Sequence, residues 1–142
     1  MTARLMPAVV GPAPIDPAAL DAAVRSAAAG AVVTFAGTVR DHDGGRTVTA
    51  LVYEAHPDAA AWLDRLLAEW AAAHPDCLAA AAAHRTGALA IGEVAFAASV
   101  AAAHRAEAFA GCADLVDRVK AGLPVWKDQA FADGTRQWVN AP

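Results

Sequence analysis

Apolar residues recur every three or four positions in three stretches of the chain, which is the spacing of an amphipathic helix. Asp16-Pro17 opens the first stretch, because Asp accepts hydrogen bonds from free amides and Pro fits the first helical turn. Gly30 is suited to close it. The pattern therefore predicts helices over residues 17–30, 57–74 and 104–120.

Two β-rich runs follow the first predicted helix. Residues 31–39 combine β-branched and apolar side chains, which favours a buried strand. Residues 47–54 alternate well enough between apolar and polar positions to favour a second strand. The polar loop of residues 40–46 lies between the two runs. We therefore expect the two strands to pair as one hairpin with a long loop.

Further strands are predicted in the second half of the chain. Residues 77–85 are ambiguous, because their alanines permit a helix, but their length and position favour a strand. Residues 93–100 favour another strand, and residues 126–139 contain Asp133-Gly134 between strand-like runs, a signal for a short hairpin. This order lacks the regular alternation of a doubly wound sheet. It predicts a single α+β domain over residues 1–142 with a mainly antiparallel sheet.

The composition is that of a globular protein, with 57% hydrophobic and 18% charged residues. Much of the apolar fraction is alanine, which packs thinly, so we expect a sizeable buried interface to supplement the core. The net charge of -4 argues against general nucleic-acid binding. No apolar run approaches the length of a membrane span, and no secretory signal is evident. These features predict a cytoplasmic protein that binds neither nucleic acid nor membrane.

Basic residues stand at three informative places in this acidic chain. Lys120 and Lys127 flank a turn containing Pro124 and Trp126, which restrict both lysines and remove some of their water. An amine held in this way can bind an anion, act as an acid or base, or attack a carbonyl. Arg40 follows a predicted strand, and its guanidinium suits a phosphate or carboxylate.

His104-Arg105 opens the third predicted helix, where free amides already favour anions. Each basic position also has a simpler interpretation, that of a surface side chain with a local partner. The local alternatives are an Arg40 ion pair with Asp41 or Asp43, a helix cap by His104, and an Arg105 ion pair with Glu107 or Asp114. Solvated surface positions are the corresponding alternative for the two lysines.

The two ends of this predicted helix are too far apart for one small ligand. Lys120 lies sixteen residues after His104, which is roughly 24 Å along a straight helix. If both ends serve one pocket, one end must come from another copy of the chain. We therefore hypothesise a homodimer with shared sites.

The histidines and cysteines form no metal-binding pattern such as HExxH or a Cys/His cluster. Asp41-His42-Asp43 could bind a cation, but a solvated loop is the better interpretation. Cys77 and Cys112 form no CxxC pair and are expected to be reduced, buried thiols. We expect no metal ion and no other cofactor.

Several short motifs occur in a fixed order from about Gly30 to Val139. They include Phe35-x-Gly37-x-Val39-Arg40, Tyr53-Glu54-Ala55, His84-Arg85-x-Gly87-x-Leu89, His104-Arg105-x-Glu107-Ala108-Phe109, Lys120, Pro124-x-Trp126-Lys127 and Gly134-x-x-x-Trp138-Val139. Each piece alone is weakly specific, whereas the ordered set is specific. The set resembles the large, catalytic subunit family of molybdopterin synthase.

The resemblance implies an α/β-hammerhead-type fold and a sulfurtransferase built on a central homodimer. A small ubiquitin-like sulfur-carrier subunit would bind at each end and give a heterotetramer. The carrier's C-terminal Gly-Gly tail, charged as a thiocarboxylate, would enter the pocket of the large subunit. The substrate would be cyclic pyranopterin monophosphate, and two sulfur transfers would make the dithiolene of molybdopterin in molybdenum cofactor biosynthesis.

The resemblance also implies roles for residues. Lys120 and Lys127 would be catalytic. The expected substrate-binding set is Thr38, Val39, Arg40, His104, Arg105, Lys120, Lys127, Asp128 and Gln129.

Three positions depart from the family pattern, in which position 129 is commonly acidic, position 56 is usually Tyr and position 38 is often Lys. The chain has Gln129, His56 and Thr38. The loss of a carboxylate at position 129 removes one plausible partner of Lys127. Asp128 could supply this carboxylate instead, although adjacent residues of a strand point to opposite faces of the sheet. Two alternatives follow, a catalytically weakened homologue that still binds the carrier and an unrelated phosphoester-binding enzyme.

Overall fold

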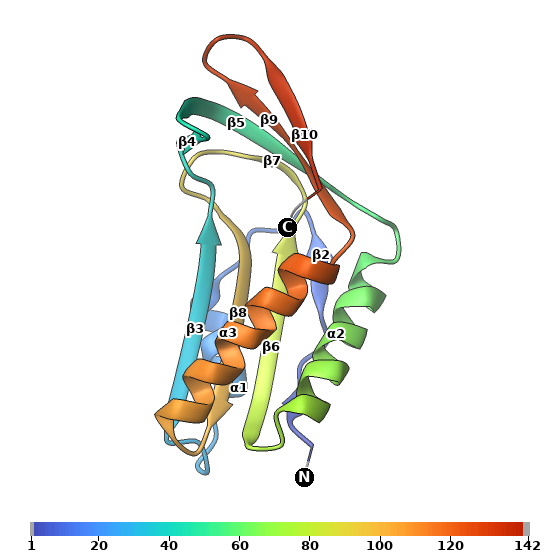
Figure 1. Cartoon of the computed structure of the whole chain (residues 1–142). Helices are drawn as coiled ribbons and strands as arrows, with labels where there is room; N and C mark the ends of the chain where they lie inside the picture. Colours follow the sequence, from blue (N-terminus) through green and yellow to red (C-terminus); the bar gives the residue numbers. More distant parts are fainter. Residues whose placement is uncertain (1, 141–142) are drawn as a thin grey trace.

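The computed structural model describes residues 2–140, which form three helices and ten strands arranged in two sheets (Figure 1). The helices are α1 (Pro17–Val24), α2 (Ala59–Ala73) and α3 (Arg105–Gly122). Asp16 caps α1, since its side chain accepts a hydrogen bond from the amide of Ala18 at 3.1 Å. None of the helices between residues 2 and 140 is long and apolar enough to cross a membrane.

The first sheet carries the core of the domain. Its strands are β1 (Arg4–Leu5), β2 (Val9–Gly11), β3 (Ala31–Thr38), β6 (Cys77–Arg85) and β8 (Val94–Ala102). The order is β1-β6-β8-β3, and β2 also pairs with β6. Only β1 and β2 run parallel to their neighbour β6, while the remaining pairs are antiparallel.

The second sheet lies at one end of the first (Figure 1). Its strands are β4 (His42–Asp43), β5 (Arg46–Ala55), β7 (Gly87–Leu89), β9 (Val125–Phe131) and β10 (Arg136–Val139). The order is β10-β9-β5-β4, and β7 also pairs with β5. All of these pairs are antiparallel.

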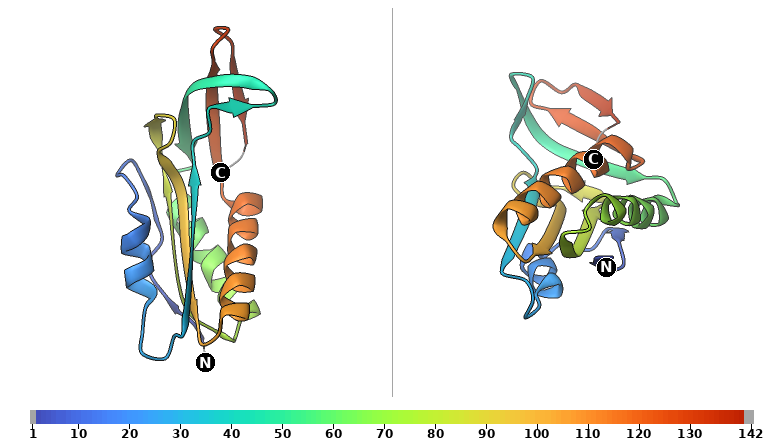
Figure 2. Two further views of the ribbon diagram at one scale, coloured as in Figure 1. Left: turned by 90° about the vertical axis from the view of Figure 1, so that its left-hand side faces the viewer. Right: turned by 60° about the horizontal axis from the view of Figure 1, so that its bottom comes forward.

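The first sheet is covered on both faces, with α1 on one side and α2 and α3 on the other (Figure 2). Its central strands β6 and β8 are rich in alanine and almost fully buried. Small side chains let the helices approach the sheet closely. At Gly111 of α3, for example, an added Cβ would lie 2.7 Å from Cys77 Sγ on β6. The fully buried Trp70 donates a hydrogen bond to the Gly111 carbonyl at 2.8 Å, which joins α2 to α3.

Most of the predicted elements are confirmed, including the ambiguous strand over residues 77–85. The prediction for the first helix is wrong at its end, because α1 stops at Val24 and not at Gly30. Val24 is its last large apolar residue, and the alanines after it offer little surface to bury. The strands β1, β2, β4 and β7 were not predicted, since each has only two or three residues.

The predicted hairpin between residues 31–39 and 47–54 is wrong. Strand β3 pairs with β8 in the first sheet, whereas β5 pairs with β4, β7 and β9 in the second. Gly44 and Gly45 have φ of 57° and 76°, and this left-handed pair makes a tight turn between β4 and β5. The chain therefore leaves the first sheet after β3 and folds back on itself only in the second. The single sheet expected from the sequence is accordingly divided into two.

Candidate active site

A cavity of about 200 Å³ lies at the junction of the two sheets. Its lining comes from the end of β3, from β5, β8 and β9, and from the last turn of α3. The lining residues are Gly37, Thr38, Arg40, Tyr53, Ala95, Phe96, Lys120 and Lys127. Residues far apart in the sequence thus meet where the chain passes between the sheets.

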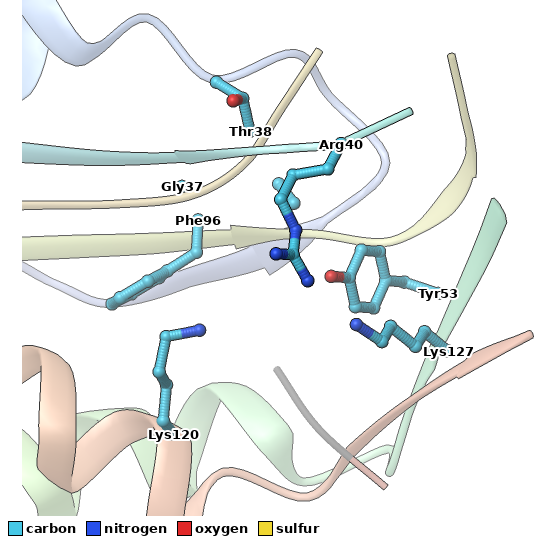
Figure 3. A pocket seen from close by; sticks show the side chains of 8 residues that line it. Gly37, Thr38, Arg40, Tyr53, Phe96, Lys120 and Lys127 are labelled. Carbon is cyan, nitrogen blue, oxygen red and sulfur yellow. The ribbon is translucent and has the colours of Figure 1, made fainter. Parts of the chain in front are cut away.

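Three cationic side chains share this cavity (Figure 3). Arg40 follows β3, Lys120 belongs to the last turn of α3, and Lys127 lies on β9. Figure 3 shows their charged groups directed towards one another, with the Tyr53 hydroxyl close to Arg40. Because like charges repel, such a cluster is most stable when an anion lies between them. The charge of this cavity therefore suits an anionic ligand.

Lys127 is the half-buried member of the cluster. Burial lowers the pKa of its ammonium group, and the positive charges of Arg40 and Lys120 lower this pKa further. The carboxylate of Asp43 acts in the opposite direction and raises the pKa. A lysine whose pKa lies below the usual range gives up its proton more easily near neutral pH, which suits acid–base work.

Three uncharged rings, those of Tyr53, Phe96 and His84, adjoin the cationic side chains. The cavity-lining rings of Tyr53 and Phe96 both contact His84, with ring centroids 4.8 and 6.0 Å from that of the imidazole. Burial lowers the pKa of His84 to about 4, so the ring is neutral at pH 7. Its Nδ1 donates a hydrogen bond to the Arg85 carbonyl at 2.8 Å. Positive charge at this site is consequently confined to the arginine and the two lysines.

Asp43, which was not predicted as a site residue, places a carboxylate beside the cluster. Its Oδ1 lies 3.6 Å from Arg40 Nη2, so the local ion pair considered for Arg40 is present. Its Oδ2 accepts a hydrogen bond from Gln129 Nε2 at 2.8 Å. Asp128 faces elsewhere, since it is buried and accepts a 3.0 Å hydrogen bond from Arg136 Nε. Neither Asp128 nor Gln129 lines the cavity.

The opposite end of α3 carries the other predicted cations. His104 and Arg105 are exposed and lie beside a separate cavity of about 490 Å³, which Gly30 also lines. His104 occupies the N-cap position, but its side chain makes no capping hydrogen bond. A Cβ at Gly30 would lie 2.5 Å from the Ala103 carbonyl oxygen, so only glycine allows this loop to pass so close to the helix start. The structure thus keeps these two residues away from Lys120 and Lys127 of the same chain.

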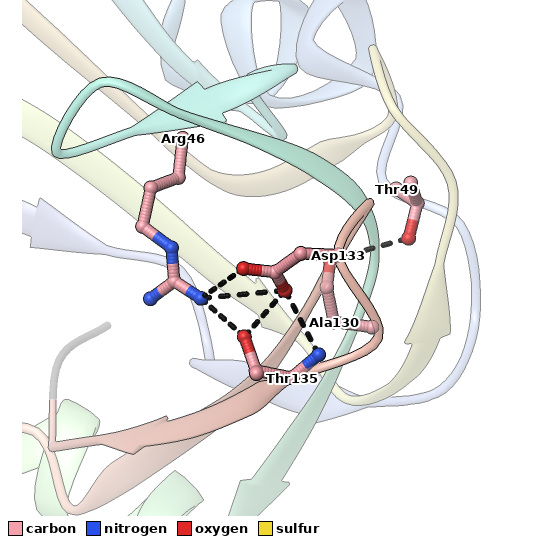
Figure 4. A network of polar contacts seen from close by, with 5 residues as sticks. All are labelled: Arg46, Thr49, Ala130, Asp133 and Thr135. Atoms are coloured by element: carbon pink, nitrogen blue, oxygen red, sulfur yellow. Dashed lines mark hydrogen bonds and ion pairs between the residues drawn. The ribbon is translucent and has the colours of Figure 1, made fainter.

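A polar network holds the hairpin that carries Lys127 (Figure 4). Arg46, at the start of β5, lies over the Phe131 ring at 3.7 Å and donates to Asp133 at 3.1 Å. Thr135 donates to the same carboxylate from both its hydroxyl, at 2.6 Å, and its amide, at 2.9 Å. These hydrogen bonds lower the pKa of Asp133 to about 2, with the Thr135 hydroxyl as the largest cause. The network fixes the β9–β10 turn against β5.

Sequence reasoning located the cations but only part of their surroundings. Of the predicted residues, Thr38, Arg40, Lys120 and Lys127 line the cavity, while Val39 is buried next to it. The lining residues that were not predicted are Gly37, Tyr53, Ala95 and Phe96. All four belong to motifs or strands already noted in the sequence, but only the sheet junction shows that they meet.

Comparisons with known proteins agree with this geometry. The MoaE protein family model matches residues 10–122. The molybdopterin synthase catalytic subunit of Thermoplasma volcanium is 39% identical over 110 residues, which cover 78% of this chain and 80% of that protein.

Solved structures share the fold. The crystal structure of molybdopterin synthase from Staphylococcus aureus superposes with a TM-score of 0.85 at 28% identity, covering 92% of this chain and 95% of that chain. A complex of subunits 1 and 2 of molybdopterin-converting factor from Helicobacter pylori gives a TM-score of 0.73 at 19% identity, covering 94% and 90%, and supports the fold alone.

These matches confirm the family predicted from the sequence. They also confirm the predicted function, that of a molybdopterin synthase catalytic subunit. The mixed α and β domain with mainly antiparallel sheets is confirmed as well. On the evidence of its sequence, its fold and its cationic cavity, the chain belongs to the MoaE protein family.

Proposed function

We propose that this chain transfers sulfur from the thiocarboxylated Gly-Gly tail of a small ubiquitin-like carrier subunit to cyclic pyranopterin monophosphate. Two transfers would make the dithiolene of molybdopterin. The observation that carries the proposal is the convergence of Arg40, Lys120 and Lys127 on one cavity of about 200 Å³. Both reactants are anions, and a site with three cations and one nearby carboxylate favours such ligands.

Each cation has a role that follows from its position. Lys120 projects from the end of α3 and binds the carbonyl of the carrier tail, where negative charge develops during transfer. Lys127, with its lowered pKa, protonates the leaving oxygen or stabilises the intermediate. Arg40 binds the cyclic phosphate through its planar guanidinium, with Thr38 beside it. The sulfur comes from the carrier, so the buried thiols Cys77 and Cys112 need no catalytic role.

His104 and Arg105 complete the phosphate site only if they come from a second copy of the chain. Helix α3 has 18 residues and is about 27 Å long, so its start cannot reach the cavity at its own end. We therefore propose a homodimer with shared sites.

Strand β3 supplies a surface for this homodimer. Within residues 2–140 it pairs only with β8, which leaves its other edge open. An apolar groove of about 340 Å³ between β3 and α3 lies beside this edge, and Phe109 at its rim is 62% exposed. Antiparallel pairing of β3 with its copy would bring the Thr38 end of one chain to the Ala31 end of the other. Arg105 of one copy would then approach the cavity of its partner.

The carrier subunit is the second proposed partner. The Helicobacter pylori structure that shares this fold is a complex of two subunits of molybdopterin-converting factor, which supports a small-subunit partner for this chain. Glycines at the end of a carrier tail have no side chains, so such a tail fits a narrow cavity between two sheets. We propose a heterotetramer in the cytoplasm, with the homodimer at its centre and an α/β-hammerhead-type fold in each large subunit.

Reconstitution tests this function. The purified chain is mixed with a thiocarboxylated carrier and cyclic pyranopterin monophosphate, and dithiolene-bearing molybdopterin is measured. We expect product that is absent without the carrier. A stable complex with an active carrier but no product would contradict the proposal and indicate a carrier-binding homologue without activity. Turnover of the precursor without any carrier would also contradict it and indicate another phosphoester-binding enzyme.

A further inference from the structure

Asp43 and Gln129 form a contact between two strands of the second sheet. Gln129 is 3% exposed and lies two residues after Lys127 on β9, so both side chains leave the same face of the strand. Asp43 comes from β4, which the Gly44-Gly45 turn fixes against β5. The 2.8 Å hydrogen bond from Gln129 Nε2 holds one carboxylate oxygen, and the other oxygen faces Arg40 at 3.6 Å.

We propose that Asp43, anchored by Gln129, is the positioning residue of this site, which orients Arg40 and holds a negative charge on the face of the second sheet that carries Lys127. The proposal deepens the proposed sulfur transfer and rests on it. The sequence has no acidic residue at position 129, and the structure supplies a carboxylate to the same face from another strand. Asp128 cannot serve, because its side chain leaves the opposite face of β9 and pairs with Arg136.

The charges around Lys127 support this role. The groups that act on it are Asp43 from β4, Arg40 after β3 and Lys120 from α3, while Tyr53 opposite it on β5 is neutral at pH 7. Burial and the two cations lower the pKa of Lys127, and only Asp43 among these groups raises it. The pKa of Asp43 is itself lowered, first by the Gln129 hydrogen bond and then by the charges of Lys127 and Arg40. Asp43 is therefore ionised wherever Lys127 needs a counter-charge.

The direction of the pH effect follows from these charges. Lys127 is active as an ammonium ion, so activity falls as the pH rises through its pKa. Removing the Asp43 carboxylate lowers that pKa, so the alkaline limb of the kcat profile moves to lower pH. We expect Asp43→Asn to shift the alkaline limb to lower pH, because Asp43 is the only group of this set that raises the pKa of Lys127. Gln129→Ala leaves the carboxylate in place but unanchored, so its shift has the same direction and is smaller.

The experiment measures the Lys127 titration by NMR of the full chain with labelled lysine, together with the kcat profile of the reconstituted enzyme. Asp41→Asn is the matched control, because Asp41 lies two residues before Asp43 and its carboxylate pairs with the exposed His42 at 2.9 Å, away from the cavity lining. We expect the control to leave both quantities unchanged. Because the titration needs no turnover, a shift in Asp43→Asn supports the positioning role even if the proposed reaction fails.

A charge swap separates positioning from structural support. The double variant Asp43→Asn/Gln129→Glu keeps a carboxylate–amide hydrogen bond and moves the charge to the other strand. We expect it to restore the Lys127 pKa and most of the kcat lost in Asp43→Asn. The proposal is overturned if Asp43→Asn lowers the melting temperature while the Lys127 titration and the alkaline limb stay in place. It is also overturned if the swap restores neither.

Discussion

The two ends of helix α3 present cations in different settings. At its C-terminal end, Lys120 shares a cavity with Arg40 and Lys127, and the Asp43 carboxylate lies beside Arg40. At its N-terminal end, His104 and Arg105 are exposed, and the two make no ion pair with any residue in the described part of the chain, 2–140. The contrast supports the proposed homodimer, in which the N-terminal end of α3 would serve the site of the partner copy.

The middle of the same helix serves the core. Cys112, Leu115, Val116 and Val119 are buried between α3 and the first sheet. This apolar face packs on the first sheet along the length of α3 and so holds the two cationic ends in place. It takes no part in their chemistry. Substitutions at the ends and in the middle of α3 are therefore expected to change different quantities.

The largest effect is expected at the C-terminal end. Lys120→Ala or Lys127→Ala should lower kcat by about a thousandfold, the loss expected when a group that stabilises developing charge is removed. The melting temperature should change little, since Lys120 is exposed and Lys127 only half-buried. Single-turnover assays of the reconstituted enzyme measure the effect. Arg118→Ala is the control on the same helix, because Arg118 pairs with Asp114 at 2.8 Å, away from the cavity. Near-normal activity in either lysine variant would remove the role assigned to it.

A smaller effect, on another quantity, is expected in the middle of the helix. Leu115 is fully buried, and Leu115→Ala should lower the free energy of unfolding by about 2–5 kcal/mol through lost burial and a residual cavity. Activity per folded molecule should persist at temperatures where the variant is folded. Urea unfolding and active-site titration measure the two quantities separately. If Leu115→Ala lowered kcat as strongly as the two lysine substitutions, the separation of core and site along α3 would be wrong.

The N-terminal end should affect substrate binding more than turnover. The double variant His104→Ala/Arg105→Ala removes the two charge-assisted contacts that we propose for the phosphate, and we expect kcat/KM to fall about a hundredfold, mostly through KM. Arg65→Ala on α2 is the matched control, since Arg65 lies over the exposed Trp62 ring at 4.7 Å. An unchanged KM in the double variant would contradict a phosphate-binding role for this end.

The sequence predicted the cations because their signals are local. Lys120 follows an apolar helical stripe, and Lys127 follows a Pro and Trp turn, so both positions could be located without knowledge of the fold. Arg40 was found for the same reason, at the end of a β-rich run. Helix length alone also indicated that His104 and Lys120 cannot meet in one chain, and the separate cavities agree with it.

The carboxylate partner could not be predicted in the same way. Asp43 reaches Gln129 across 86 positions of the sequence, through strands of the second sheet whose pairing is not encoded by any local pattern. The expected hairpin between β3 and β5 would have kept Asp43 in an outer loop. The two-residue strand β4 and the Gly44-Gly45 turn instead carry it towards β9. Long-range strand pairing therefore decided the part of the site that sequence reasoning missed.

Mixing two impaired chains tests the shared site most directly. Lys127→Ala and His104→Ala/Arg105→Ala chains are combined, dissociated and reassociated with the thiocarboxylated carrier, and product formation is measured at a substrate concentration well below KM, where each variant alone is weakly active. If each site takes Lys127 from one copy and Arg105 from the other, half of the dimers hold one intact site, and activity should recover to about a quarter of the unaltered enzyme. Activity no higher than the average of the two separate variants would contradict a site shared between copies.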